Sequence, residues 1–495
     1  MATKIYSCSF SGLECQIVEV EADISNGLPS FHIVGLGDIS VQESKERVRL
    51  SIKNSGMHFP LTRKTINLAP AELRKQGALF DLPIALSILI ASKQVSPDRL
   101  EKALIVGELS LDGRVKKISG ALPIAQAAKE AGFTKVFLPS ENSKEAAFIA
   151  GISVYPLESL SQLIDHCQNN IDILPQPKTR IIKVESDSDH FSGIFGLELA
   201  KRALTIAAVG GHNALLSGSP GCGKTVISRA FRSILPPMSE REIIETTKIF
   251  SIAGLLNEEF PFVTRRPFRE LHHTASISSV IGGGSQPKPG EISLAHNGVV
   301  FFDEIAEFPK ALLESLRQPL EDKFIHINRA KSSLKFPSNF SLIATMNPCP
   351  CGYHGDKKVK CICTDHQVKQ YQKKLSGPLL DRFDIFLDII KSPIKDLFEK
   401  SRAQGQNLKS KVSSAQKIQL QRGARNSDLS IKQIKEFCRL DQKSQTILNQ
   451  ATRNLHLSTR AYFKTIRIAR SIADLEQSPA IQLEHITEAI QYRQR

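Results

Sequence analysis

Residues 218–225 have the sequence GSPGCGKT, which matches the pattern G-x-x-x-x-G-K-T at every fixed position. The apolar run 213–217 before it can form a strand, and a helical pattern starts at once with Val226. Glycines in such a loop let backbone N–H groups surround phosphates at a helix N-terminus, while the Lys neutralises the β- and γ-phosphates and the Thr holds Mg²⁺. We therefore expect ATP and Mg²⁺ to bind at Gly218, Ser219, Pro220, Gly221, Cys222, Gly223, Lys224 and Thr225.

A second acidic motif, GVVFFDEI at residues 298–305, fits the same chemistry. Its four apolar residues in a row are typical of a parallel strand covered on both faces. Asp303 is expected to bind Mg²⁺, and Glu304 to activate the attacking water as general base. The alternative is a strand end that merely turns to solvent, which the upstream phosphate loop makes a minor possibility.

Three further polar residues are candidates for the same site. Asn347 ends an apolar run, SLIATMN, and is expected to orient the lytic water. Arg382 lies in GPLLDRFD, where it can reach a neighbouring subunit's γ-phosphate as an arginine finger or instead pair within the chain with Asp381 or Asp384. Arg460, at the opening of a C-terminal helix, is a candidate second-sensor arginine.

The length of 495 residues suggests about three folding units at roughly 150 residues each. Residues 1–168 alternate short β-rich runs with helical patterns, which predicts an α/β domain. The polar, proline-containing stretch 169–190 is expected to be a linker. An α/β nucleotide-binding core follows over 191–393. The segment 394–495 is expected to be a helical C-terminal domain, with its helices after a further polar stretch at 401–425.

Composition favours a soluble protein with an acidic partner. Lys and Arg number 65 against 50 Asp and Glu, a net charge of +15, so a nucleic acid is a natural partner, unless the excess charge only keeps the protein soluble. The chain has no Trp, which argues against a base-stacking platform. No apolar run is long enough to span a bilayer, and the start, MATKIYSCSFSGLEC, lacks the apolar segment of a signal peptide. We expect a cytoplasmic protein that makes no membrane contact.

Residues 324–336, FIHINRAKSSLKF, alternate on both sides of a polar turn and so predict a β-hairpin. Its basic residues are expected to follow DNA phosphates without reading bases, unless they are ordinary solvated charges. The candidates are Arg329, Lys331 and Lys335. The 78 residues that separate Thr225 from Asp303 exceed what a minimal nucleotide core needs, and they include the Gly/Pro-rich stretch 282–290.

Four of the nine cysteines form the pattern C-x-C-x₉-C-x-C within fifteen residues. In a reducing compartment, four thiolates at this spacing favour a structural zinc site, and the polar loop between the pairs has too few apolar residues to order itself. The alternative is a reduced cluster without metal, and His354 is an alternative ligand. The expected ligands are Cys349, Cys351, Cys361 and Cys363.

Taken together, the motifs resemble those of a known family. The phosphate loop, RPFRELHHTAS (266–276), residues 282–304, MNPCPCG (346–352), SGPLLDRFD (376–384) and residues 457–475 are similar to the magnesium-chelatase-like AAA+ proteins, and within them to the YifB/ComM competence branch. The resemblance implies an AAA+ P-loop core with a helix-2 insert, a pre-sensor hairpin and a helical C-terminal lid. It also implies a homo-hexameric helicase that promotes branch migration on single-stranded and branched DNA, as in natural transformation.

The N-terminal segment resembles the Lon-protease-like fold, of the ribosomal S5 domain 2-like class. Asp81, Leu82 and Pro83 lie where the nucleophilic Ser of such proteases is expected, and Leu122 lies near the position of the Lys base. A Ser–Lys dyad is therefore not expected, and an ATP-dependent protease is disfavoured. The remaining alternative is a chelatase-like or protein-remodelling ATPase, because magnesium chelatase shares the same core.

Overall fold

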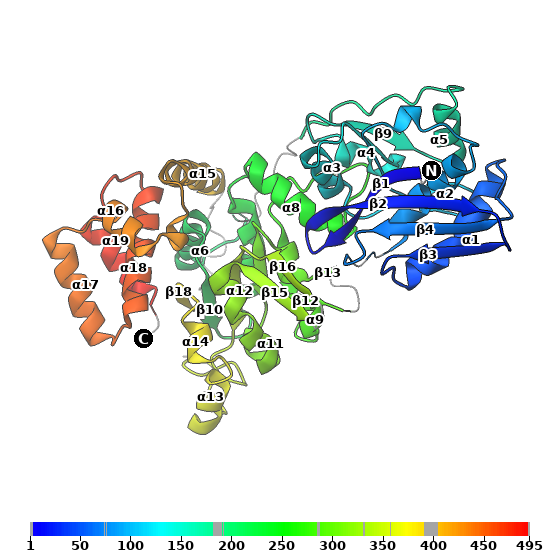
Figure 1. The fold of residues 1–495 in the computed structure, drawn as a ribbon. Helices are drawn as coiled ribbons and strands as arrows, with labels where there is room; N and C mark the ends of the chain where they lie inside the picture. Colours follow the sequence, from blue (N-terminus) through cyan, green and yellow to red (C-terminus); the bar gives the residue numbers. More distant parts are fainter. Residues whose placement is uncertain are drawn as a thin grey trace. The chain divides into compact units, whose positions relative to one another are not determined.

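The computed structural model describes residues 3–73, 75, 77–181, 191, 193–284, 288–329, 332–356, 358–390 and 404–493. The chain divides into two compact units (Figure 1). Unit 1 comprises Met1–Lys183, Ile243–Thr264 and Asn328–Lys335, and unit 2 comprises Val184–Glu242, Arg265–Ile327 and Phe336–Arg495. The domain boundaries at 168, 190 and 393 remain predictions, and the last two lie outside the described residues.

Unit 1 is built on a seven-stranded mixed sheet in the order β3-β4-β2-β1-β5-β8-β9. The strands β1 and β2 form an antiparallel hairpin in which Thr3 faces Ala22, and β5, β8 and β9 run parallel. Helix α2 is its most buried helix, since every residue from Asp81 to Ile90 is buried. The strands are β1 Thr3–Ser11, β2 Glu14–Ser25, β3 Ser30–Val34, β4 Arg63–Ala69, β5 Ala103–Ile105, β6 Glu108–Leu109, β7 Val115–Lys116, β8 Lys135–Pro139 and β9 Ser153–Leu157. The helices are α1 Ile39–Asn54, η1 Ala78–Phe80, α2 Asp81–Ala91, η2 Asp98–Leu100, α3 Ala121–Glu130, α4 Ser140–Ala146 and α5 Leu160–Cys167.

Unit 2 contains a five-stranded, wholly parallel sheet in the order β11-β14-β17-β10-β18. Its strands are β10 Ala214–Gly218, β11 Phe268–Leu271, β14 Val299–Phe302, β17 Ser341–Met346 and β18 Ile385–Ile389. All residues of β14 and β17 are buried, as expected for central strands covered on both faces. Because the strands are parallel, all their carboxyl ends lie at one edge, where ligands bind in such sheets.

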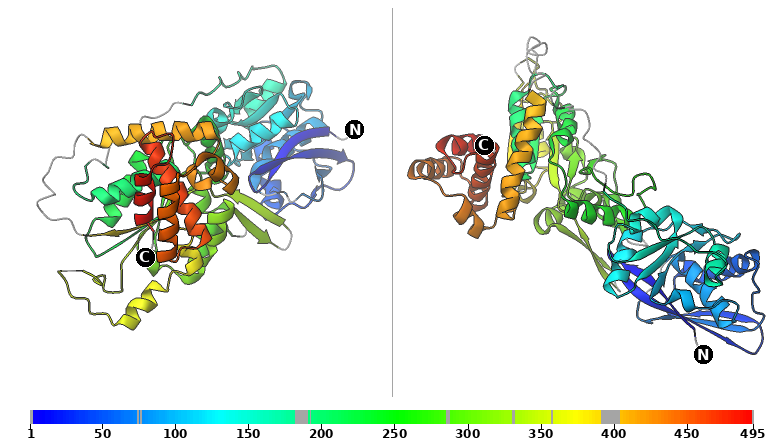
Figure 2. Two further views of the ribbon diagram at one scale, coloured as in Figure 1. Left: turned by 90° about the vertical axis from the view of Figure 1, so that its left-hand side faces the viewer. Right: turned by 90° about the horizontal axis from the view of Figure 1, so that it is seen from above.

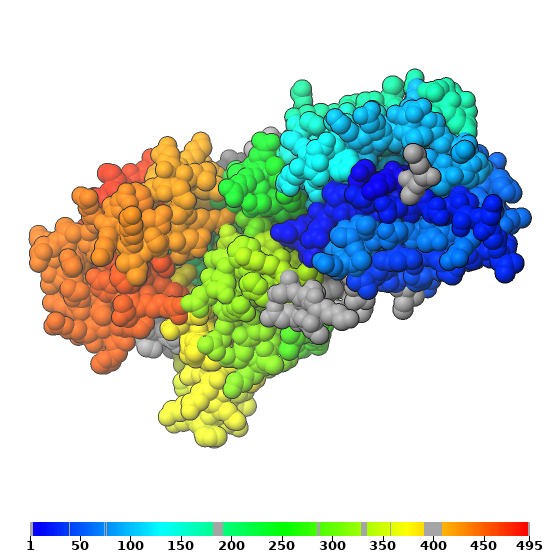
Figure 3. Space-filling view, viewed as in Figure 1, coloured from blue at the N-terminus to red at the C-terminus, as the bar shows by residue number. Residues whose placement is uncertain are grey.

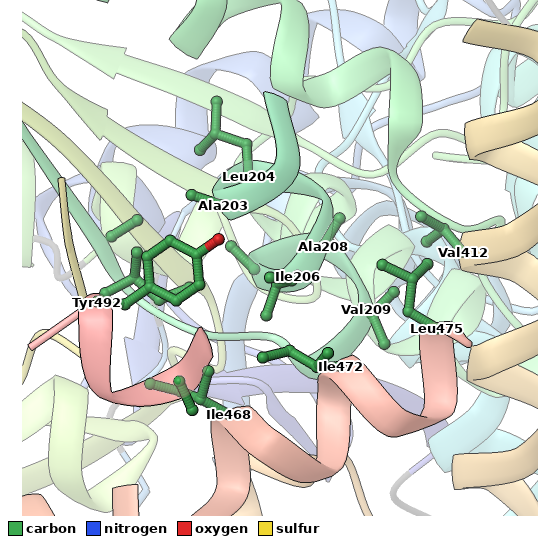
Figure 4. Packing of buried hydrophobic residues seen from close by; sticks show 14 of the residues in the cluster. Ala203, Leu204, Ile206, Ala208, Val209, Val412, Ile468, Ile472, Leu475 and Tyr492 are labelled. Carbon is green, nitrogen blue, oxygen red and sulfur yellow. The ribbon is translucent and has the colours of Figure 1, made fainter. Parts of the chain in front are cut away.

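The C-terminal region is helical and packs on a helix that precedes the first strand of this sheet. Its elements are α15 Gln404–Arg422, η6 Asn426–Asp428, α16 Ile431–Phe437, α17 Gln442–Asn454, α18 Thr459–Leu475 and α19 Leu483–Gln491. Figure 2 shows α16–α19, in orange to red, gathered in one bundle. Helix α6 (Glu198–Gly210) lies between α15 and α18, and its Ile206 and Val209 share one apolar cluster with Val412 and Ile472 (Figure 4).

Helix α15 corrects one expectation, because the polar stretch at 401–425 contains a helix of 19 residues. Its composition is polar, but Val412 and Ala415 are fully buried against α6. A narrow apolar stripe and tertiary packing thus stabilise a helix that the local composition does not indicate.

The remaining elements connect the strands of the parallel sheet, and parts of α8, β15 and β16 are among the segments that belong to unit 1. They are α7 Lys224–Ala230, η3 Phe231–Ile234, α8 Glu240–Ile252, α9 Ile277–Ile281, β12 Gly282–Gly283, β13 Lys288–Pro289, α10 Glu291–Leu294, η4 Ile305–Glu307, α11 Lys310–Ser315, α12 Arg317–Asp322, β15 Phe324–Arg329, β16 Ser332–Pro337, α13 Asp365–Gln372 and α14 Gly377–Leu380. The expected hairpin is present as β15 paired with β16. Among the described residues, no helix has both the length and the apolar character needed to cross a membrane.

Candidate nucleotide site and cysteine cluster

The loop 218–225 joins the carboxyl end of β10 to the start of α7. Gly221 and Gly223 have φ values of 75° and 92°, which L-residues with a side chain rarely adopt. At Gly218, a Cβ would lie 2.5 Å from the carbonyl oxygen of Ile389, so this position also needs glycine. The ammonium of Lys224 donates to the carbonyl oxygens of Gly218 and Ser219 at 2.6 and 3.0 Å, and burial lowers the pKa of this Lys. The loop therefore holds the Lys224 ammonium with carbonyl groups of its own backbone.

The hydroxyl of Thr225 and the carboxylate of Asp303 meet in front of this loop. Thr225 Oγ1 lies 3.1 Å from both carboxylate oxygens of Asp303. Thr345, on the neighbouring strand β17, donates its hydroxyl to Asp303 Oδ1 at 2.6 Å. A hydroxyl and a carboxylate at the carboxyl edge of the sheet are the ligand types that Mg²⁺ takes beside nucleotide phosphates.

Glu304 and Asn347 form the second half of the site. Asn347 Nδ2 donates to Glu304 Oε1 at 3.3 Å, and Asn347 Oδ1 accepts from Lys224 Nζ at 3.1 Å. Glu304 has a φ of 53°, and its backbone N–H donates to Thr345 Oγ1 at 2.9 Å. A non-glycine residue in this conformation is held by its surroundings, and such residues gather at functional sites.

The two candidate arginines converge on one carboxylate. Arg382, before β18, and Arg460, at the start of α18, both bond to the side chain of Glu321 in α12. Arg382 is therefore paired within the chain, and its partner is Glu321. The sequence had suggested Asp381 or Asp384 as its partner, in the alternative to an arginine finger. A cavity of about 310 Å³ opens beside Arg382 and is lined by Glu314, Arg317, Gln318, Glu321 and Asp322 as well.

Buried ion pairs hold the elements around the site. Burial alone would raise the pKa of Asp384, but Lys464 at 2.8 Å and His212 outweigh it and hold the pKa well below its usual value. Arg266, the first residue of the RPFRELHHTAS motif, is nearly buried and donates to Glu242 at 2.9 Å and to the carbonyl oxygens of Pro236 and Asn297. Arg266 thus stabilises the fold and lies outside the set of groups that meet at the phosphate loop.

The four cysteines of the C-x-C pairs lie together after β17. Their sulfur atoms are all within 4.8 Å of one another, and three of the separations are 3.4, 3.7 and 3.5 Å. All are free thiols in the part of the chain that the structure describes. His354 contributes its backbone N–H, which donates to Cys349 Sγ at 3.3 Å, and its ring does not belong to the cluster. The segment projects from the rest of unit 2, in yellow in Figure 3.

The hairpin residues are only partly described. Lys335 lies in β16 and is exposed, whereas Lys331 and the side chain of Arg329 lie outside the described residues. DNA contacts at these positions remain a prediction. The stretch 282–290 contains the short strands β12 and β13, and residues 285–287 are also outside the described residues.

Comparisons with known proteins agree along the whole chain. The family described as Magnesium chelatase, subunit ChlI, matches residues 190–397, Subunit ChlI of Mg-chelatase matches 20–142, and Magnesium chelatase, subunit ChlI C-terminal, matches 402–493. Competence protein ComM of Haemophilus influenzae is 38% identical over 503 residues, which cover 99% of this chain and 97% of that protein. The uncharacterized protein YifB of Escherichia coli is 37% identical over 486 residues, 97% and 95% of the two chains. The chain belongs to the ComM/YifB branch of the magnesium-chelatase-like AAA+ family.

This membership confirms the fold predicted from the sequence motifs, an AAA+ core with a helical C-terminal region. Lon protease 2 of Bacillus subtilis is 25% identical over 176 residues, 33% of this chain and 30% of that protein, in agreement with a Lon-like N-terminal domain. Asp81 and Leu122 lie at or near the positions where a Lon-type protease carries its Ser and Lys, and both are fully buried in this chain. Arg47 donates to Asp81 at 2.6 and 3.1 Å. These positions therefore form part of a packed interior.

Sequence reasoning missed two residues of the AAA+ site. Thr345 contacts both acidic residues, and the signal for it was a single hydroxyl in an otherwise apolar strand. Glu321 pairs with both arginines, but it lies 61 and 139 residues from them and no motif marks it.

Proposed function

We propose that this AAA+ protein hydrolyses ATP at the edge of the unit 2 sheet. The observation that carries the proposal is the joining of two networks, Thr225–Asp303–Thr345 and Lys224–Asn347–Glu304, directly in front of one glycine-rich loop. The residues fit ATP with Mg²⁺. Positive φ at Gly221 and Gly223 bends the backbone into a phosphate cradle, and a Cβ at Gly221 would meet only open space. Bound ATP supplies the γ-phosphoryl group, and Mg²⁺ neutralises its charge.

Each residue then has a distinct task. Lys224 exchanges its backbone carbonyl partners for phosphate oxygens. Their negative charge offsets the cost of burying the ammonium. Thr225 and Asp303 hold Mg²⁺, and Glu304 accepts a proton from the attacking water. Asn347, already bonded to Glu304, orients that carboxylate and the water. Arg382 lines an open cavity with Glu321, and Arg460 bonds to the same carboxylate, so both arginines are proposed to approach the phosphates of a neighbouring subunit.

We propose further that a homo-hexamer uses this hydrolysis to move DNA and promotes branch migration during integration of transforming DNA. Three observations support this proposal: the relative named competence protein ComM, the net charge of +15, and the basic hairpin β15–β16. Single-stranded and branched DNA are the proposed partners, and the cytoplasm is the proposed location. The cofactors are ATP, Mg²⁺ and a structural Zn²⁺ at the four cysteines.

The decisive experiment measures ATP hydrolysis with and without forked DNA, together with strand displacement of that fork. We expect forked DNA to raise the hydrolysis rate several-fold and ATP to drive displacement. Glu304→Gln should bind ATP but lose about 10²-fold or more in hydrolysis, since a general base contributes about that much. A rate that DNA leaves unchanged, with no displacement, would refute the DNA motor while leaving the ATPase intact.

A protein-remodelling ATPase is the second candidate. It is favoured by the match of all three magnesium chelatase families to the chain. It predicts that hydrolysis responds to a protein partner and ignores DNA, which the same assay separates.

A further inference from the structure

The segment 349–363 contains two aliphatic side chains, and neither stabilises it by burial. Ile362 is 86% exposed and Val359 is 40% exposed. The segment is nevertheless folded back so that its first and last cysteines meet. Without a hydrophobic core, a loop of this size needs another source of order, and binding of a metal provides folding free energy in such loops.

The sulfur geometry fits zinc. Four thiolates at a Zn–S distance of about 2.3 Å in a tetrahedron lie roughly 3.8 Å apart. The separations of 3.4, 3.7 and 3.5 Å between Cys349, Cys351 and Cys361 are close to this value. The backbone N–H of His354 donates to Cys349 Sγ, and Gly352 N donates to Cys349 O at 2.9 Å in a tight turn. The loop therefore folds closely around the sulfur atoms.

This loop is attached to the nucleotide site at two places. Cys349 is fully buried and lies two residues after Asn347, the residue that bonds to both Lys224 and Glu304. Gly352 packs directly on the phosphate loop, since a Cβ at Gly352 would lie 2.6 Å from Cγ and Cδ of Pro220. At its other end, Cys363 is followed at once by Thr364, which caps α13 with a capping box. The cysteine loop is thus fixed to β17, to α13 and to the phosphate loop.

We infer that a zinc ion held by Cys349, Cys351, Cys361 and Cys363 fixes the turn at Gly352 and the end of β17, so that metal loading controls nucleotide binding and hydrolysis. This inference rests on the proposed ATPase function. Zinc holds Asn347 and Pro220 in their positions relative to Lys224 and Glu304. Loss of the metal releases the turn, and the site loses its geometry although every residue that touches nucleotide is still present.

The first experiment compares the parent chain with a Cys361→Ser/Cys363→Ser variant, which removes two ligands far in sequence from the nucleotide residues. We expect about one zinc per parent chain and none in the variant. We also expect the variant's affinity for a fluorescent ATP analogue and its kcat/KM to fall at least about tenfold, because small misplacements of catalytic groups have effects of this size. Cys15→Ser, which removes a thiol in unit 1, is the matched control and should keep parental values.

The second experiment leaves all ligands in place and changes only the contact with the phosphate loop. Gly352→Ala should retain zinc but lose nucleotide affinity, because its Cβ meets Pro220. Gly355→Ala is the matched control. Gly355 has a φ of 80° against 85° at Gly352, so the backbone strain is similar, but a Cβ there would meet nothing within 4 Å. Gly355→Ala should therefore bind nucleotide as the parent does.

The outcomes separate the inference from the proposed function. Parent protein purified without chelators that contains no zinc overturns the inference. Zinc-free Cys361→Ser/Cys363→Ser protein that binds and hydrolyses ATP like the parent also overturns it, and leaves the ATPase proposal standing. If the zinc-loaded parent binds ATP but does not hydrolyse it, the ATPase proposal fails, and the affinities of the Gly352 and Gly355 variants still decide the inference.

Discussion

At the residue scale, Thr345 links the two acidic residues of the nucleotide site. Its hydroxyl donates to Asp303 and accepts from the backbone of Glu304 in a left-handed conformation. One oxygen thereby sets the position of a proposed Mg²⁺ ligand and of the proposed general base.

Replacement of Thr345 by Val keeps the shape and removes that oxygen. We expect single-turnover hydrolysis to slow by about 10–100-fold while the affinity for ATP changes little, because the lost bonds position groups for chemistry more than for binding. Thr205→Val is the control, since Thr205 is also buried but bonds only within α6 to Lys201 O. An unchanged rate in Thr345→Val would remove Thr345 from the site.

Glu321 is the second residue that motifs do not mark. It pairs with Arg382 and Arg460, so both arginines must leave it to act as proposed on a neighbour's phosphates. Ion pairs that are partly exposed contribute about 1 kcal/mol or less. We therefore expect Glu321→Ala to raise the hydrolysis rate by about two- to fivefold, whereas Arg382→Ala should abolish it.

Asp322→Asn, in the same cavity wall, is the matched control for Glu321→Ala and should leave the rate unchanged. If Glu321→Ala lost activity as Arg382→Ala does, the carboxylate would instead be required to aim the arginines.

The sequence predicted most of the residues that the structure brings together, for a physical reason. Lys224, Asp303, Glu304 and Asn347 each follow an apolar strand or a glycine-rich loop, and parallel strands place their carboxyl ends side by side. Thr345 and Glu321 escaped because their importance comes from partners on other elements, which no local pattern encodes.

At the scale of elements, apolar strands were predicted well and polar elements poorly. The buried β14 is an uninterrupted apolar run, and β17 is apolar apart from Ser341 and Thr345. In contrast, β2, with sequence ECQIVEVEADIS, alternates with charged residues and was not identified. Helix α15 was not predicted for the same reason, because only a few buried residues stabilise this otherwise polar helix. Elements of this kind are stabilised by tertiary contacts that lie far away in sequence.

Glu242 shows how charges join such elements. It lies in α8 and pairs with Arg266, before β11, and with Arg425, after α15. Burial alone would raise its pKa, but the two guanidinium groups outweigh burial and lower the pKa to about 2. A lowered carboxyl pKa stabilises the fold above the unfolded-state value of about 4.3, and this stabilisation is lost as the pH falls toward 2.

We therefore expect the parent's free energy of unfolding, from urea titrations, to decrease between pH 5 and pH 3, with up to about 1.5 kcal/mol of that decrease due to Glu242. Glu242→Gln should be less stable at pH 7 and show a smaller decrease over that range. Glu240→Gln, exposed on the same helix, should behave like the parent. A Glu242→Gln variant as stable as the parent at pH 7 would contradict this account.

At the scale of the whole molecule, the residues proposed for hydrolysis belong to two different clusters of the chain. The phosphate loop and Glu304 lie at the edge of the sheet, and Arg382 lies with Glu321 beside a separate cavity. We propose that a complete site forms only where the loop of one subunit meets the arginines of the next. Assembly in a ring is then a condition for hydrolysis.

The most direct test co-expresses two inactive variants. Lys224→Ala lacks the phosphate-loop cation and Arg382→Ala lacks the finger, so each alone should be inactive. If their subunits assemble at random, about a quarter of the interfaces should pair an intact loop with an intact finger and restore about that share of parental ATP hydrolysis. A mixture of Lys224→Ala with Glu304→Gln is the control and should stay inactive, because both lesions lie in the loop-bearing half. Restored activity in the first mixture alone is the predicted result, and a first mixture as inactive as its components would contradict the shared site.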